Sequence, residues 1–193
     1  MEFMTLSILS YLVGSISFGI VFSHIFRLQD PRSFGSKNPG ATNVMRTGKK
    51  LPALLTLIGD ASKGSLMVWI AKSSGLSLQD TLIVASLVFL GHIYPIYYKF
   101  KGGKGVATAF GVLVILNLNL ALMVLVVWLT AFIISRISSL SALLAALSVP
   151  VIAYLISVQS PEMRFYLFLS AVLIYRHKDN IKKILSNKES QFK

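Results

Sequence analysis

The chain has 193 residues, of which 54% are hydrophobic and 13% are charged, and its mean hydropathy is +0.71. A soluble domain usually carries about 25% charged residues, so the composition indicates a membrane protein. The net charge is +12, and the basic residues lie in short loops between apolar runs, which argues against a nucleic-acid-binding protein. Cysteine is absent, which excludes disulfides and thiol chemistry.

The first apolar run covers roughly residues 4–26 and follows Glu2 instead of a basic segment. A cleaved signal peptide would begin with basic residues, so we predict a retained transmembrane helix with its N-terminus outside. Further apolar runs cover residues 51–71, 81–98, 106–135, 140–158 and 163–175. The run 106–135 is too long for one span of about 20 residues, and it contains Asn117-Leu118-Asn119, which can turn the chain.

The basic residues decide between six helices and seven. With six, Arg136 and the basic tail 176–193 would lie outside, against the positive-inside rule. A turn at Asn117–Asn119 places all the strongly basic segments inside. We therefore predict an all-α integral membrane protein with seven transmembrane helices, the N-terminus outside and the C-terminus cytoplasmic. The fourth helix is expected to be short, about 12 residues or roughly 18 Å. Residues 1–193 are expected to form a single membrane-embedded domain.

The first inside loop, residues 27–50, is basic and rich in small polar side chains. Asn38-Pro39-Gly40 is typical of a turn, because proline presets φ and glycine accepts positive φ. Hydroxyls, amides and a guanidinium suit a phosphate or a polyol, whereas the alternative is a solvated membrane loop. The candidate binding residues of this loop are Ser36, Asn38, Thr42, Asn43 and Arg46.

The second inside loop, residues 99–105, reads Lys-Phe-Lys-Gly-Gly-Lys-Gly. An ATP-binding loop is disfavoured, because Lys104 is followed by Gly105 instead of Ser or Thr. A glycine turn that leads into a helix N-terminus suits an anion, although the lysines alone could grip lipid headgroups. The candidate residues here are Gly102, Gly103, Lys104, Gly105 and Thr108.

Asp60 and Lys63 lie three residues apart in the second apolar run, on one face of the expected helix. An ion pair within a membrane helix is expensive and can mark function, but we favour a role in helix packing. His92, near the end of the third run, is expected to be only hydrogen bonded.

The remaining candidates follow Arg136 and open the C-terminal tail. Ser138, Ser139 and Ser141 are expected mainly to cap the sixth helix, with Ser141 also a candidate for the site. His177 begins the tail, and Asn180 follows one helical turn later. No histidine cluster or carboxylate-rich motif predicts a metal site.

Together these motifs resemble the bacterial acyl-phosphate:glycerol-3-phosphate acyltransferase family of the PlsY type. The resemblance rests on residues 35–43, on Gly91-His92 with residues 99–108, and on residues 177–181, and it includes Gly14-Ser-Ile-Ser-Phe-Gly19. It covers essentially the whole chain. Family members often have Pro at Ser17, Gly at Lys37 and Arg at Lys178, so Lys37 and Lys178 are poor candidates for essential residues.

The resemblance implies transfer of a fatty acyl group from acyl phosphate to glycerol 3-phosphate, which gives lysophosphatidic acid and inorganic phosphate. This would be the first acylation of phospholipid biosynthesis, by a multi-pass protein of the bacterial cytoplasmic (inner) membrane with its site facing the cytoplasm. Acyl phosphate is already activated, so no cofactor and no covalent enzyme intermediate are expected. The expected partners are the two substrates, membrane lipid and neighbouring enzymes of phospholipid synthesis, without nucleic acid; the oligomeric state stays open.

We assign residue roles as a hypothesis that follows from this resemblance. Lys104 and the N–H groups of Gly102, Gly103 and Gly105, assisted by Thr108, hold one phosphate. Arg46 and the polar residues of the first loop hold the other phosphate and the glycerol hydroxyls. His177 and Asn180 close the site, and the proton of the attacking hydroxyl goes either to His177 or to the donor's own phosphate. Rival functions are a transporter of organic phosphates and a lipid-binding protein without catalytic activity.

Overall fold

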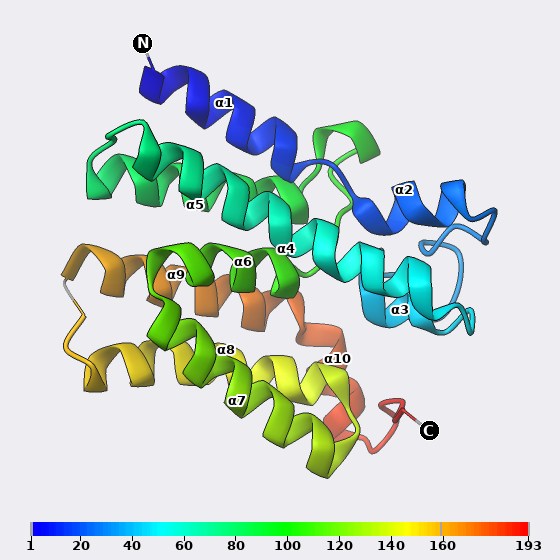
Figure 1. Ribbon diagram of the computed structural model, residues 1–193. Helices are drawn as coiled ribbons and strands as arrows, with labels where there is room; N and C mark the ends of the chain where they lie inside the picture. The colour runs from blue at the N-terminus through cyan, green and yellow to red at the C-terminus, as the bar shows by residue number, and fades with distance from the viewer. Residues whose placement is uncertain (1, 159, 193) are drawn as a thin grey trace. The chain divides into compact units, whose positions relative to one another are not determined.

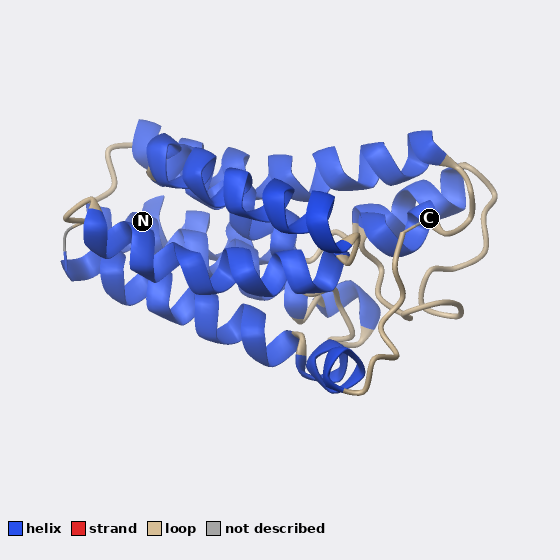
Figure 2. Ribbon diagram, turned by 90° about the horizontal axis from the view of Figure 1, so that it is seen from below, coloured by secondary structure: helices blue, strands red, loops and turns tan. Residues whose placement is uncertain are grey.

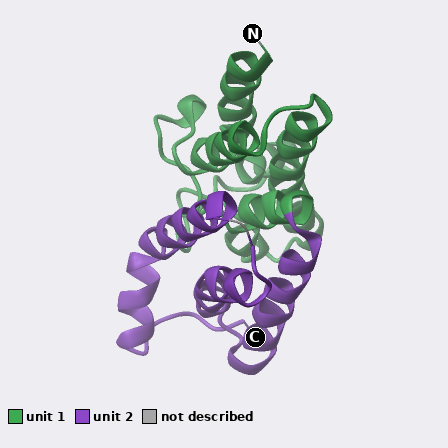
Figure 3. Cartoon of the chain, turned by 90° about the vertical axis from the view of Figure 1, so that its left-hand side faces the viewer, with its two compact units in different colours: residues 1–116 green, residues 117–193 purple. Residues whose placement is uncertain are grey.

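The computed structural model describes residues 2–158 and 160–192. Within these residues every regular element is a helix, and loops join the helices (Figure 2). The chain divides into two compact units, residues 1–116 and residues 117–193 (Figure 3). The predicted all-α class is therefore confirmed, and a single domain over residues 1–193 stays a prediction.

Unit 1, residues 1–116, consists of two pairs of packed helices and two structured loops. Its helices are α1 (Glu2–Gly14), α2 (Phe18–Ile25), α3 (Ala41–Met45), α4 (Lys50–Ser73), α5 (Leu78–Ile93), the short 3-10 helix η1 (Ile96–Tyr98) and α6 (Val106–Leu116). In Figure 1, α1 lies along α5 and α6 along α4. Small residues allow both approaches: a Cβ on Gly14 would overlap Val88 of α5, and one on Gly111 would overlap Ala61 of α4.

The first apolar run forms two helices where we predicted one. Residues 15–17 separate α1 from α2, and the two axes differ by 47°. The Ile16 carbonyl, which the break frees, accepts a hydrogen bond from Lys63 Nζ (2.6 Å). Beside it, the Ser15 side-chain hydroxyl accepts a hydrogen bond from the Ile96 N–H (3.3 Å). A break inside an apolar helix requires such partners, because lipid supplies none.

Unit 2, residues 117–193, contains α7 (Leu118–Ser135), α8 (Ser138–Leu155), α9 (Ser160–Arg176) and α10 (Lys178–Leu185). Helix α8 packs against both α7 and α9 over a core that includes Leu120, Val149, Tyr166 and Leu169. The Asn117 side chain accepts a hydrogen bond from the Leu120 N–H (3.0 Å) and so caps α7. The predicted break inside residues 106–135 is therefore confirmed.

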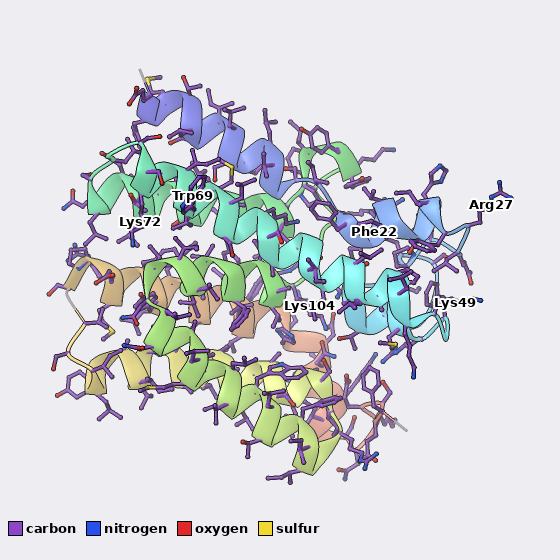
Figure 4. All side chains as sticks on the ribbon, in the orientation of Figure 1. Phe22, Arg27, Lys49, Trp69, Lys72 and Lys104 are labelled. Carbon is purple, nitrogen blue, oxygen red and sulfur yellow. The ribbon has the colours of Figure 1, made fainter. Side chains whose placement is uncertain are left out.

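Within the part of the chain that the structure describes, four helices are long and apolar enough to cross a membrane, and the bent pair α1–α2 would make a fifth. The four are α4, α5 extended to Tyr98, α7 and α8, whereas α6 has only 11 residues, as expected for the fourth helix. Large apolar side chains such as Trp69 (Figure 4) and Ile133 are exposed on these helices, at 56% and 73%. The protein is thus an integral membrane protein with several spans, and seven spans stay a prediction.

Candidate functional site

The first inside loop, called the first basic loop below, ends at residue 49 because α4 begins at Lys50. One buried amide gives this loop its shape. Asn43 of α3 is fully buried. Its Oδ1 accepts a hydrogen bond from the Ser36 N–H (3.0 Å), and its Nδ2 donates to the carbonyls of Pro31 (2.7 Å) and Phe34 (3.2 Å). Asn43 therefore holds the loop together, and its predicted role in binding a substrate stays a prediction.

Arg46 ends α3 and is exposed, and it crosses the loop at Gly35. Gly35 has φ +56°, and a Cβ there would meet both Asn43 Oδ1 and the Arg46 side chain. Glycine at this position therefore lets the guanidinium pass over the loop. The other candidates of this loop, Ser36, Asn38 and Thr42, are partly buried around it.

The second basic loop, residues 99–105, is called the glycine turn below. It begins with two consecutive left-handed residues, Lys99 (φ 53°) and Phe100 (φ 59°). The Gly102 N–H then donates to the Ile93 carbonyl (3.2 Å), and the Gly103 N–H donates to the His92 carbonyl (3.1 Å). Both N–H groups donate to backbone carbonyls at the end of α5, and a role of Gly102 and Gly103 in holding a phosphate stays a prediction.

The end of the glycine turn leads directly into α6. Gly105 has φ +90°, and a Cβ there would run into the Phe89 ring. Lys104 is partly buried at this point of the chain (Figure 4), next to the helix N-terminus, where the first N–H groups have no carbonyl partner within the helix. Thr108, in the first turn of α6, is fully buried, and within the described residues its hydroxyl has no hydrogen-bond partner. A cation beside a helix N-terminus suits an anion.

Unit 2 contains the candidate His177, which precedes α10 and is 2% exposed. Its Nδ1 lies 2.8 Å from the Leu173 carbonyl oxygen. Because a carbonyl only accepts, we assign the hydrogen of the ring to Nδ1, and Nε2 of the neutral ring then bears the lone pair. This tautomer allows Nε2 to accept a proton.

Glu189, which the sequence analysis did not single out, binds the candidate residue Asn180. Its Oε1 accepts hydrogen bonds from Asn180 Nδ2 (2.8 Å) and from the Ser139 hydroxyl (2.8 Å). One carboxylate thus orients Asn180 and ties the tail to the start of α8. The only signal in the sequence was an acidic residue in a lysine-rich tail, which did not single it out.

The serines after Arg136 do not cap α8 as predicted. The N-cap position is Ile137, which makes no side-chain cap bond, and the Ser141 hydroxyl donates to the Ile137 carbonyl one turn back (2.9 Å). Ser141 is fully buried. Its hydroxyl therefore serves its own helix, and its role in a site stays a prediction.

The candidates fall into two sets. Unit 1 holds the first loop, with Arg46, and the glycine turn, with Lys104; the Arg32 guanidinium lies over the Tyr98 ring at 5.5 Å and links that loop to η1. Unit 2 holds Ser141, His177 and Asn180. Among the described residues, no group of three His, Cys, Asp or Glu side chains is arranged to hold a metal ion.

Comparison with known proteins gives consistent matches over the whole chain. The sequence model of the family described as glycerol-3-phosphate acyltransferase matches residues 4–187. Glycerol-3-phosphate acyltransferase of Methylobacillus flagellatus is 52% identical over 96% of this chain and 94% of that protein, and the one of Nitrosomonas eutropha is 49% identical over 94% and 93%.

Two solved structures show the same fold. Both are of PlsY (YgiH), described as an integral membrane glycerol 3-phosphate acyltransferase, one in the glycerol 3-phosphate form and one in the lysophosphatidic acid form. The first has a TM-score of 0.95 at 36% identity and the second 0.92 at 35%, and each match covers 100% of this chain and 96% of that one. The chain therefore belongs to the glycerol-3-phosphate acyltransferase family of the PlsY type.

Proposed function

We propose that this protein transfers a fatty acyl group from acyl phosphate to glycerol 3-phosphate and so forms lysophosphatidic acid and inorganic phosphate. Its enzyme class, glycerol-3-phosphate acyltransferase, follows from its family. The observation that carries the proposal is the full-length match to PlsY, whose two structures represent a glycerol 3-phosphate form and a lysophosphatidic acid form. The identity of the acyl donor, acyl phosphate, is part of this proposal.

The reaction needs one bond made and one broken. A hydroxyl oxygen of glycerol 3-phosphate attacks the acyl carbonyl carbon and forms the ester bond. The bond between that carbon and the phosphate oxygen breaks, and phosphate leaves with the electron pair. Cations stabilise the charge that gathers on the leaving phosphate, which is the role we give to Lys104 and Arg46.

The hydroxyl proton has two possible acceptors. His177 Nε2 has the lone pair that a general base needs if Nδ1 carries the hydrogen beside the Leu173 carbonyl. The alternative acceptor is a phosphate oxygen of the donor. General-base catalysis contributes about 10²–10⁴-fold, so a His177→Ala variant that loses less than about 100-fold in kcat would assign the proton to phosphate.

Lys104 and the N-terminus of α6 form the phosphate seat in unit 1. The proposal gives this seat to one substrate phosphate and gives Arg46, with the polar residues of the first loop, to the other. In unit 2 the candidates for the reaction are His177 and Asn180, and Glu189 orients Asn180. Kinetics of Lys104→Ala and Arg46→Ala decide which group binds which phosphate. The variant that raises only the KM for glycerol 3-phosphate identifies the residue that binds the acceptor.

The direct test is acyl transfer by the purified protein in detergent. We expect acyl phosphate to release inorganic phosphate when glycerol 3-phosphate is present, with one lysophosphatidic acid formed per phosphate. Lys104→Ala and Arg46→Ala should reduce turnover strongly, whereas a lipid-binding protein would show no turnover to lose. Transport of glycerol 3-phosphate into vesicles without acyl transfer would overturn the proposal in favour of a transporter.

We also propose seven spans in the bacterial cytoplasmic membrane, with the N-terminus outside and the site facing the cytoplasm. The chain has no cysteine, so single cysteines can report orientation without background. Gln79→Cys, in the first turn of α5, should react with an impermeant thiol reagent from outside, and Lys188→Cys, in the tail, only after the membrane is opened. The reverse pattern would invert the topology.

A further inference from the structure

Three ionisable side chains meet in the interior of unit 1, outside the site described above. Asp60 Oδ1 lies 2.9 Å from Lys63 Nζ and 3.5 Å from His92 Nδ1. The three side chains are 2–6% exposed. Asp60 and Lys63 come from α4, and His92 comes from the last turn of α5. We call these three residues the ionic network.

The network is not explained by stability alone. Desolvation of a buried ion pair can exceed the attraction between its charges, and the cost is greater in a helix that can span a membrane. Apolar residues of similar volume would pack α4 against its neighbours at least as well. The contacts that Lys63 and His92 make with residues outside the network therefore indicate what the network does.

One outward contact fixes the break between α1 and α2. Lys63 Nζ donates to the Ile16 carbonyl at 2.6 Å and lies 5.9 Å from the centroid of the Phe18 ring. Phe18 begins α2, and its ring packs on Gly59 of α4, where a Cβ would overlap it. Lys63 thus supplies the donor that a broken helix needs in apolar surroundings.

The other outward contact supports the glycine turn. The carbonyls of His92 and Ile93 accept the N–H groups of Gly103 and Gly102. The His92 ring also lies against Gly103, because a Cβ there would overlap its Nε2. The same ring faces Asp60 through Nδ1. Asp60 therefore orients the side chain on which the glycine turn rests.

We propose that Asp60, Lys63 and His92 are positioning residues that hold the glycine turn and the α1–α2 break in the geometry the phosphate seat requires. Lys63 contacts the break, His92 contacts the turn, and Asp60 holds both side chains, so the three residues act on substrate only through the turn and the break. The proposal rests on the proposed function for the role of Lys104. How well the backbone of the glycine turn is ordered can, however, be measured without an enzyme assay.

The first experiment measures hydrogen–deuterium exchange of the peptide that covers the glycine turn, in detergent-solubilised protein. His92→Leu should speed exchange of this peptide about ten-fold or more, because the turn loses the ring beneath Gly103 and its link to Asp60. His92→Asn, which keeps a polar group facing Asp60, should preserve more protection. Equal exchange in wild type and both variants would overturn the proposal.

The second experiment separates positioning from charge balance. Asp60→Asn and Lys63→Met each leave one buried charge without its partner, so both should lower thermal stability. The double variant removes both charges and should recover stability but not protection of the turn, because the Ile16 carbonyl lacks its donor and a neutral amide at position 60 attracts the His92 ring less than a carboxylate does. Recovery of both properties would mean that the network only balances its own charges.

The third experiment reads the kinetic consequence against a matched control. Asp60→Asn should lower kcat/KM about 10- to 100-fold, with an increased KM for at least one phosphate substrate, because a displaced turn misplaces Lys104. Lys72→Met is the control: Lys72 lies on the same helix, and its Nζ donates to the Ile115 carbonyl (3.1 Å), but it is exposed and lies near the opposite end of α4 from Lys49 (Figure 4). Lys72→Met should keep the wild-type KM.

These outcomes keep the two proposals distinguishable. An inactive wild type with a protected turn would overturn the proposed function and leave the network's structural role intact. An active wild type, with Asp60→Asn unchanged in exchange and in KM, would overturn the network proposal alone.

Discussion

The first basic loop and the glycine turn both present cations in unit 1, but different parts of the chain give them their shape. The first loop depends on the Asn43 side chain, which joins three backbone groups of residues 31–36. The glycine turn depends on backbone bonds to the end of α5 and on the absence of side chains at Gly103 and Gly105.

The two designs predict opposite sensitivities. A loop held by a buried side chain fails when that side chain is removed, because its partners stay buried and unsatisfied. A turn held by close backbone contact fails when an atom is added, because packed interiors do not yield to an extra methyl group. Substitutions at single positions can therefore test each mechanism separately.

Gly105→Ala is expected to have the largest effect. The added Cβ would meet the Phe89 ring at a φ of +90°, and the strain and the overlap together should cost about 2–5 kcal/mol. Because the distorted turn carries Lys104, acyl transfer should fall about 100-fold or more. Thermal unfolding and turnover of the purified variant measure the two effects.

Gly48→Ala is the matched control for that substitution. Gly48 also has positive φ (78°), but nothing lies within 4 Å of a Cβ built there. It should cost only about 1 kcal/mol of backbone strain. Equal losses in the two variants would show that packing against Phe89 does not define the turn.

Asn43→Ala is the corresponding test of the first loop. It should destabilise the protein by about 2–3 kcal/mol, because the Ser36 N–H and two carbonyls lose a buried partner. Asn43→Asp retains an acceptor for the Ser36 N–H but loses the two donated bonds, so it should not restore wild-type stability. Full stability of Asn43→Asp in a thermal melt would mean that only the Ser36 bond matters.

Features held by residues close together in the chain could be predicted from the sequence, whereas features held by distant residues could not. The α6–α7 break was predictable, because Asn117 caps α7 through the Leu120 N–H three residues along. The break between α1 and α2 was not, because its donor, Lys63, lies 47 residues away. The same holds for the candidate site: Lys104 and the glycines form a local pattern, whereas the partners of Gly103 and Glu189 are set only by the fold.

Lys37→Gly should stabilise the first loop. Lys37 is exposed with φ +56°, a conformation that costs a residue with a Cβ about 1–2 kcal/mol. Glycine removes this strain but loses more entropy on folding, so we expect a net gain of about 0.5–1 kcal/mol.

Lys101→Gly, in the glycine turn, is the control for Lys37→Gly. Lys101 is exposed as well, but its φ is not positive. The substitution should therefore give no gain in a thermal melt. If both variants gain stability by a similar amount, the cause is the removal of positive charge and not the relief of backbone strain.

Asp30→Asn should have the smallest effect, because the ion pair it breaks lies at the exposed edge of the first loop. Asp30 Oδ2 and Arg32 Nη2 are 2.6 Å apart, with the two side chains about 40% exposed, and such pairs contribute about 0–1 kcal/mol. The hydrogen bond from Arg32 lowers the pKa of Asp30 below its ordinary value. The pair therefore stabilises the fold above the unfolded-state pKa of about 3.9, and this contribution is lost as the pH falls through the lower folded-state pKa. Thermal melts of wild type and Asp30→Asn should differ slightly at neutral pH and converge in acid; a difference that persists in acid would mean that Asp30 acts through its backbone turn and not through its charge.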